Sequence, residues 1–181
     1  MTRASLELRY PAVFLDRDGT IMRDVDFCSD PEAVEIFEGA AGALQRLKEA
    51  GFKLFVITNQ SGIGRGYFSE TEYRAVEKEV ERKLGPNLID ATYFSPDKPG
   101  DESRRRKPAP EMVFEAAREH NVDLSRSFFV GDKAIDVECG QNAGVRTVLV
   151  RTGYAETSRC SPTWTADNLA AAAEIILREA K

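Results

Sequence analysis

The stretch AVFLDRDGT at residues 12–20 decides the fold that we expect for this chain. Its first four residues are apolar without a break, which is typical of a strand buried on both faces of a parallel sheet. The run stops at Asp16, and Gly19 signals a turn just after a second carboxylate, Asp18. The sequence therefore predicts a buried strand whose end carries two acidic side chains.

Three further apolar runs, at residues 54–57, 128–130 and 147–150, repeat this pattern. The first of them stops at Thr58, and the second is followed by Gly131 and then Asp132. Helical patterns separate the runs, and we expect helices at about 40–50, from Ser69 onward, at about 110–120 and after Asp167.

The alternation of apolar runs and helical patterns predicts the α/β class, with a doubly wound, mainly parallel, Rossmann-like sheet. We expect one domain over residues 1–181, with a small flap at about 23–37 and no cap domain. Ligands of such sheets bind beyond the carboxyl ends of the strands. Asp16, Thr58 and Asp132 are therefore expected to converge on one edge of the sheet.

Composition excludes several classes of function. The 181 residues include 25 Lys and Arg against 30 Asp and Glu, and the net charge of −5 argues against nucleic-acid binding. The longest purely apolar run, residues 169–173, is too short to cross a membrane, and residues 1–5 do not resemble a signal peptide. The three cysteines form no C-x-x-C pair and indicate reduced thiols in a cytoplasmic protein. We expect it to be a monomer.

The single histidine, His120, excludes a zinc site built on two histidines. It lies at the expected end of a helix, where a partial positive charge favours the helix dipole, and we assign it that structural role. The chemistry of the chain must therefore depend on carboxylates, hydroxyls, lysines or a metal held by oxygen atoms.

The pair Asp16 and Asp18 suits phosphoryl transfer. A carboxylate can attack phosphorus and form an acyl phosphate, and a second carboxylate can give a proton to the leaving oxygen and later take one from water. Carboxylates repel a phosphate unless cations intervene, and Mg²⁺ is the cation that prefers oxygen ligands. The alternative is a turn in which Asp18 merely caps the loop.

Other segments supply the groups that such a site requires. Asp132 could share a metal with Asp16, while Asp136 is also explained as an acidic residue near a helix N-terminus. A hydroxyl at Thr58 and a cation at Lys107 could bind phosphoryl oxygens, although Lys107 also fits a solvated basic run. The glycines at 62, 64 and 66 follow G-x-G-x-G spacing, which supports neither a dinucleotide fingerprint nor a P-loop.

The segments FLDRDGT (14–20), TNQSG (58–62), RKP (106–108) and VGDK (130–133) together resemble the four motifs of the haloacid dehalogenase-type phosphatases. More narrowly, they are similar to the branch that acts on heptose bisphosphate and histidinol phosphate. The resemblance implies that Asp16 is the nucleophile, Asp18 the general acid and base, and Thr58 and Lys107 the phosphoryl-binding groups. It implies Mg²⁺ on Asp16, the backbone carbonyl of Asp18, and Asp132. The implied substrate-binding residues are Asp24, Asp26, Asn59, Gln60, Ser61, Arg106 and Lys133.

The resemblance favours a small phosphorylated metabolite as substrate, with heptose 1,7-bisphosphate hydrolysed at its 7-phosphate and histidinol phosphate or another sugar or polyol phosphate as the alternative. A receiver-like phosphoacceptor domain is the alternative class, and Asp18, placed to activate water, favours the phosphatase. Many relatives carry a Cys/His zinc loop before the lysine motif. Here that stretch offers Ser95, Asp97, Ser103 and Arg105, so we expect no structural zinc.

Overall fold

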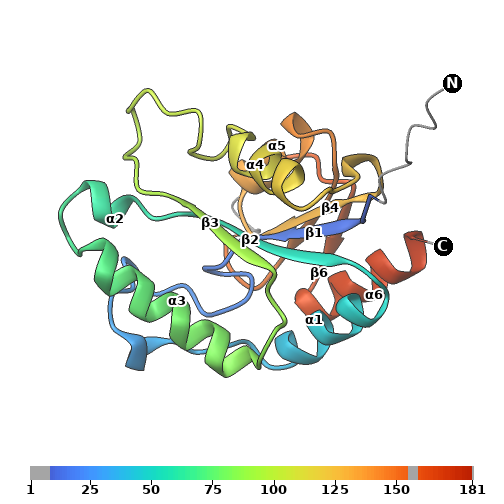
Figure 1. Ribbon diagram of the computed structural model, residues 1–181, viewed down its shortest axis with the longest axis horizontal. Coiled ribbons are helices and arrows are strands. Elements are labelled where there is room, and N and C mark those ends of the chain that lie inside the picture. Colours follow the sequence, from blue (N-terminus) through green and yellow to red (C-terminus); the bar gives the residue numbers. More distant parts are fainter. Residues whose placement is uncertain (1–8, 155–158, 181) are drawn as a thin grey trace, which may run out of the picture.

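The architecture is a six-stranded sheet between two layers of helices (Figure 1). The structure is a computed structural model that describes residues 9–154 and 159–180. The strands lie in the order β3-β2-β1-β4-β5-β6, and every neighbouring pair is parallel. The doubly wound sheet without a cap domain is thus confirmed. The strands are β1 (Ala12–Leu15), β2 (Lys53–Asn59), β3 (Ala91–Ser95), β4 (Phe128–Gly131), β5 (Arg146–Val150) and β6 (Trp164–Ala166).

Four of the longer helices lie where the sequence analysis expected them, and the helix at residues 134–142 was not expected. The longer ones are α1 (Ala40–Glu49), α3 (Glu70–Leu84), α4 (Glu111–Glu119), α5 (Ala134–Asn142) and α6 (Leu169–Glu179). One short helix, α2 (Ser61–Gly64), and two 3₁₀ turns, η1 (Pro31–Ala33) and η2 (Leu124–Arg126), complete the described elements. Ser69 and Glu72 form the capping box that begins α3, because each side chain bonds the other's backbone N–H.

Alternating residues of β1 feed two separate cores. Val13 and Leu15 pack with α1, α3 and α6 on one face, while Ala12 and Phe14 pack with α4 and α5 on the other. In Figure 1, α4 and α5 lie above the sheet, and α1, α3 and α6 lie below it. All four residues of β1 are fully buried, which explains why an unbroken apolar run encodes this strand.

The strand order reverses at β1, because β1 pairs with β2 on one side and with β4 on the other. Such a reversal opens a crevice beyond the carboxyl ends of the two strands, where α/β proteins bind their ligands. Asp16 follows β1 and Asp132 follows β4. The fold therefore delivers two motif carboxylates to the same crevice.

Some elements lie outside the sequence expectations. β3 and β6 were not expected: β3 is only partly buried and β6 is a three-residue edge strand, so neither carries an unbroken apolar run. α5 buries Asp136 beside Val137 and Cys139, so it lacks a clean apolar stripe.

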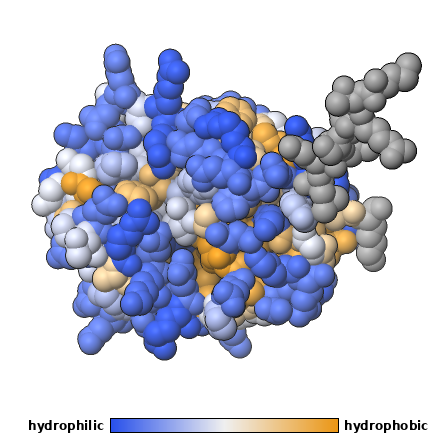
Figure 2. All heavy atoms as spheres, in the orientation of Figure 1, coloured by the Kyte–Doolittle hydropathy of each residue, from blue (hydrophilic) through white to orange (hydrophobic). Residues whose placement is uncertain are grey.

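The face of the molecule seen in Figure 2 is mainly polar, with apolar side chains gathered near its middle. Within the described ranges, no helix is both long and apolar enough to cross a bilayer.

His120 caps α4, as expected, and its ring lies 4.8 Å from that of Phe55.

Candidate active site

Lys107 connects the nucleophile candidate to a second carboxylate. Its Nζ lies 2.6 Å from Asp16 Oδ1 and 2.8 Å from Asp136 Oδ1, and it donates to the backbone oxygen of Ile57 at 2.8 Å. The Lys107 side chain is 1% exposed. Burial opposes its charge, but the carboxylates of Asp136 and Asp16 raise the pKa of Lys107 above its ordinary value. The ammonium is therefore a fixed cation beside Asp16.

Three buried carboxylates meet in the crevice. Oxygen atoms of Asp16, Asp132 and Asp136 lie within 4.8 Å of one another. Burial raises the pKa of Asp16 well above its usual range, and burial together with the Asp136 charge raises the pKa of Asp132 to about 6. Burial and, to a smaller extent, the neighbouring carboxylates disfavour the ionised forms of both groups, and a divalent cation would offset that cost.

The donor set fits a magnesium ion held by Asp16 and Asp132. Asp132 Oδ2 accepts the backbone N–H of Tyr154 at 2.9 Å, whereas its buried Oδ1 has no hydrogen-bond partner among the residues described. Asp136 differs, because its Oδ1 pairs with Lys107 and its Oδ2 accepts the Lys133 N–H at 3.0 Å. Asp136 therefore holds Lys107, and Asp132 retains an oxygen for a hard cation.

Asp18 is oriented by two neighbours. The Arg17 guanidinium donates to its carboxylate from Nη2 at 2.9 Å and from Nε at 3.2 Å. Gln60 Nε2 donates to Asp18 Oδ2 at 3.0 Å and to Thr58 Oγ1 at 2.8 Å. Arg17 is buried, and the sequence analysis did not single it out. The feature of the sequence that could have indicated its role is its position between the two aspartates that follow the apolar run.

Asn59 locks the main chain of Lys107 in place. Its Nδ2 donates to the Lys107 carbonyl at 3.1 Å, and its Oδ1 accepts the Lys107 N–H at 3.0 Å. This reciprocal pair ties the end of β2 to the loop that follows β3. Asn59, expected to bind substrate, therefore also positions the catalytic lysine candidate.

A hollow of about 440 Å³ opens beside these groups. Lys133 lies in its wall, with Nζ 3.1 Å from Asp24 Oδ2 and 4.7 Å from the centroid of the Tyr154 ring. Arg106 is not part of the lining, and its Nη1 donates to the Asp97 carbonyl at 2.8 Å. Of the expected substrate-binding residues, those that line the hollow are Asp24, Asp26, Asn59, Gln60, Ser61 and Lys133.

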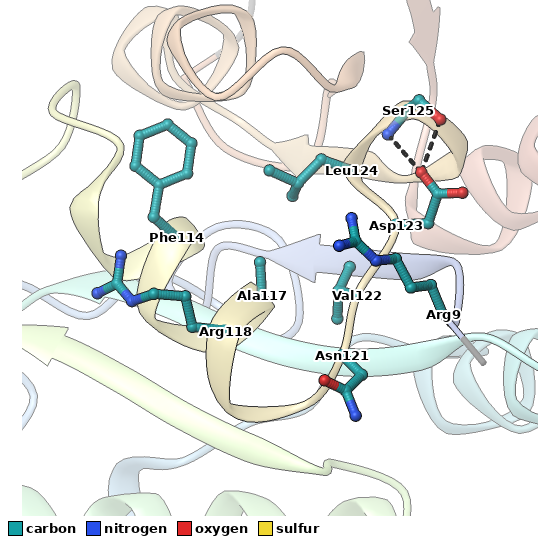
Figure 3. Close-up of a pocket in the computed structure, with 9 residues that line it drawn as sticks. All are labelled: Arg9, Phe114, Ala117, Arg118, Asn121, Val122, Asp123, Leu124 and Ser125. Atoms are coloured by element: carbon teal, nitrogen blue, oxygen red, sulfur yellow. Dashed lines mark hydrogen bonds between the residues drawn. The ribbon is translucent and has the colours of Figure 1, made fainter. Parts of the chain in front are cut away.

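A larger hollow, about 590 Å³, lies away from this chemistry (Figure 3). Its lining includes Arg9, Phe114, Arg118 and residues 121–125. These segments precede β1 and β4 or belong to α4, so the hollow lies toward the amino ends of the strands. None of the three clustered carboxylates lines it. The smaller hollow is therefore the candidate active site, in agreement with the rule for parallel sheets.

Two glycines press against Asp132. A Cβ atom on Gly19 would lie 2.5 Å from Asp132 Oδ2, and one on Gly153 would lie 2.0 Å from the same oxygen. Gly19 also has φ +85°, a region that suits glycine. The loop after β5, which carries Gly153 and Tyr154, was missed in the sequence analysis, although it follows a strand end as the other motifs do.

Replacing Gly19 with alanine is expected to disable the site. Positive φ alone costs an alanine about 1–2 kcal/mol, and a Cβ at this position would also displace the Asp132 carboxylate. Gly66→Ala is the matched control, because Gly66 has φ +72° and open space around its Cβ position. We expect both variants to lose stability in urea unfolding and Gly19→Ala alone to lose the phosphatase activity that the motif resemblance implies. Equal activities would contradict the contact with Asp132.

Comparisons with known proteins agree with this geometry. Residues 104–172 match the HAD-hydrolase-like family model. The chain is 42% identical to D-glycero-D-manno-heptose-1,7-bisphosphate 7-phosphatase of Chlorobaculum tepidum, over 82% of each chain. It is 36% identical to D-glycero-beta-D-manno-heptose-1,7-bisphosphate 7-phosphatase of Yersinia pestis, over 88% of this chain and 92% of the relative.

A solved structure extends the likeness to three dimensions. The crystal structure of D,D-heptose 1,7-bisphosphate phosphatase from B. bronchiseptica, complexed with magnesium and phosphate, matches with a TM-score of 0.86 and 32% identity. The match covers 93% of this chain and 99% of the other. The chain therefore belongs to the haloacid dehalogenase-like phosphatase family, together with these heptose bisphosphate phosphatases.

Proposed function

We propose that the chain is a Mg²⁺-dependent phosphomonoesterase that removes the 7-phosphate of D-glycero-D-manno-heptose 1,7-bisphosphate through a phosphoryl-aspartate at Asp16. The single observation that carries this proposal is the buried contact of Lys107 with Asp16, with Asp132 beside it. A carboxylate so placed has a cation at hand to offset the charge of an arriving phosphate. The names of the relatives supply the substrate.

In the first step, a carboxylate oxygen of Asp16 forms a bond to phosphorus while the bond between phosphorus and the sugar oxygen breaks. Asp18 donates its proton to that departing oxygen. Thr58 and Lys107 hold the phosphoryl oxygens. Asp16, Asp132 and the backbone carbonyl of Asp18 would hold Mg²⁺, which when bound neutralises negative charge on the phosphoryl group.

In the second step, Asp18 takes a proton from water, whose oxygen attacks phosphorus as the bond to Asp16 breaks. This returns both carboxylates to their starting states and releases inorganic phosphate. The bonds from Arg17 and Gln60 fix Asp18 toward the site for both transfers. Positioning of this kind supplies a large share of the rate acceleration of enzymes.

The test is phosphate release from heptose 1,7-bisphosphate, histidinol phosphate and p-nitrophenyl phosphate, each with Mg²⁺ and with EDTA. We expect multiple turnover, highest kcat/KM for the bisphosphate, and loss of turnover in EDTA. A preference for histidinol phosphate would replace the proposed substrate. Labelling that stops after a single turnover would favour the phosphoacceptor alternative.

Binding of the metal has its own readout. Mg²⁺ bound to the folded state raises its stability, so we expect Mg²⁺ to raise the Tm of the wild type and not that of Asp132→Asn. Asp167→Asn is the control, because Asp167 is exposed and pairs with Arg151. A full Mg²⁺ response in Asp132→Asn would remove Asp132 from the ligand set.

We also propose that the chain acts as a monomer in the cytoplasm. All residues that line the candidate active site come from one chain, which supports a monomer. The three cysteines of the chain are free thiols, as is usual in reducing compartments.

A further inference from the structure

We propose that Asp97 is a positioning residue: its carboxylate closes the loop at residues 95–106 and thereby fixes Arg106, the residue that the motif resemblance assigns to substrate binding. This inference rests on the proposed function, because Arg106 is taken to bind the substrate named there, which carries a second phosphate that is not hydrolysed. Asp97 was not among the expected site residues, and no relative's name assigns it a role.

One oxygen of Asp97 joins the two ends of the loop. Asp97 Oδ2 accepts from Ser95 Oγ at 2.9 Å and from Ser103 Oγ at 2.5 Å. Ser95 is the fully buried last residue of β3, so this end of the network is anchored in the sheet. The hydrogen bonds from Ser103 and Ser95 hold the pKa of Asp97 below its ordinary value. The carboxylate is therefore ionised at neutral pH and acts as a strong acceptor.

The network continues from Ser103 to the basic segment. Ser103 Oγ accepts the backbone N–H of Arg105 at 3.2 Å and that of Arg106 at 3.1 Å. Arg106 Nη1 then returns to the start of the loop, where it donates to the Asp97 carbonyl at 2.8 Å. The Arg106 side chain is thus bonded directly to the Asp97 carbonyl. The Arg106 main chain is joined to the Asp97 carboxylate through the Ser103 hydroxyl.

The loop is also pressed against the wall of the active site. The Gly64 N–H donates to the Pro96 carbonyl at 3.1 Å, and a Cβ on Gly64 would lie 2.5 Å from that oxygen. Gly64 ends α2, whose first residues line the hollow. In Figure 1 the loop after β3 and α2 both lie at the left of the picture, beyond the same end of the sheet. Close backbone approach therefore leaves little freedom between loop and site.

A second guanidinium group, that of Arg65, lies near the hollow. Arg65 follows α2, and its Cζ lies 5.9 Å from the ring centroid of Phe27, which lines the hollow. Burial and the nearby positive charge of Arg65 lower the pKa of Arg106. Like charges held within reach of each other repel, and an anion placed between them removes that cost. A phosphate is the anion that planar guanidinium groups suit best.

The loop closes without the usual metal ligands. Residues 95–106 contain neither cysteine nor histidine, so thiolates and imidazoles cannot hold zinc there. The serine and carboxylate hydrogen bonds supply the closure instead. Zinc at one ion per chain in protein purified without chelator would overturn this assignment.

The experiment compares Asp97→Ala with Asp101→Ala. Asp101 lies in the same loop and accepts the Lys98 N–H at 2.8 Å, but it has no bond to Ser95 or Ser103. We measure kcat and KM for heptose 1,7-bisphosphate and for p-nitrophenyl phosphate, which has a single phosphate. We expect Asp97→Ala to raise KM for the bisphosphate by ~10-fold or more, the size of one lost charge-assisted contact. We expect kcat and the KM for p-nitrophenyl phosphate to stay near those of Asp101→Ala.

Three further readouts separate positioning from general damage to the structure. Amide hydrogen exchange should speed up at residues 103–106 in Asp97→Ala and not in Asp101→Ala. Arg106→Ala should raise KM for the bisphosphate alone, and combining it with Asp97→Ala should add little, because both changes remove one coupled contact. Asp97→Asn should recover part of the affinity, since its amide oxygen still accepts from the two serines.

The outcomes distinguish this inference from the proposed function. If KM rises equally for both substrates, or if the two alanine changes add fully, Asp97 does not act through Arg106. If the wild type does not hydrolyse the bisphosphate, the proposed function fails, while faster exchange at residues 103–106 would still support the hold of Asp97 on Arg106. Unchanged exchange would overturn it.

Discussion

Asp16→Asn is expected to lower phosphate release by ~10⁴-fold or more, the scale seen when a catalytic nucleophile is removed, while the protein remains folded. An asparagine side chain cannot form the acyl phosphate that the proposed mechanism requires. The fold should survive because Lys107 keeps its contacts with Asp136 and Ile57. The measurement is single- and multiple-turnover release of phosphate from heptose 1,7-bisphosphate.

Stability serves as the control for this variant. Burial raises the pKa of Asp16, which means that the folded state takes up a proton more readily than the unfolded state. Stability linked to this group is therefore lost as pH rises, and at neutral pH the ionised carboxylate costs free energy. A neutral asparagine avoids that cost, so we expect its Tm to be close to or above that of the wild type. Near-normal turnover would mean that the nucleophile is a different residue.

Lys107→Met is expected to damage both activity and stability. Removing one partner of a buried ion pair costs about 3–5 kcal/mol, because the remaining charge is uncompensated. Here two carboxylates, those of Asp16 and Asp136, would lose their common cation. We expect activity to fall by ~10³-fold, in the range for loss of one electrostatic stabiliser. Urea unfolding and phosphate release are the measurements.

Lys48→Met is the matched control for stability. Lys48 also pairs with an aspartate, Asp90, but its side chain is 30% exposed against 1% for Lys107. Partly exposed pairs contribute about 0–1 kcal/mol. We therefore expect Lys107→Met to lower the free energy of unfolding several times more than Lys48→Met does. Similar losses would indicate that the Lys107 cluster is open to solvent.

The pH dependence of Lys107→Met has a definite sign. Without the cation, the buried carboxylates are costly when ionised and less costly when protonated. Lowering the pH from 8 to 5 should therefore reduce the stability gap between variant and wild type, as Asp16, whose pKa is already raised, takes up a proton. A gap that widens as pH falls would contradict the electrostatic origin of the loss.

The strand ends were readable from sequence because one physical rule covers them all. An apolar run that stops at a polar residue marks both a buried parallel strand and the edge at which it ends. Asp16 and Asp132 come after β1 and β4, and the structure brings their carboxylates together. Thr58 lies one residue before the end of β2 and is joined to Asp18 through the Gln60 side chain. Lys107 was recognised from its motif, and its buried contact with Asp16 came from the structure.

The tertiary structure decided how these groups are held. Asn59 on the Lys107 backbone, Gln60 on Asp18 and Gly153 against Asp132 join distant chain segments in contacts that no periodic pattern encodes. Hydrophobic periodicity reports which face of an element is buried. It does not report which polar atoms meet across the site, because those contacts depend on the packing of elements far apart in the chain. The sequence at the strand ends therefore indicated which residues carry the chemistry, and the packing of the loops around them determined how those residues are positioned.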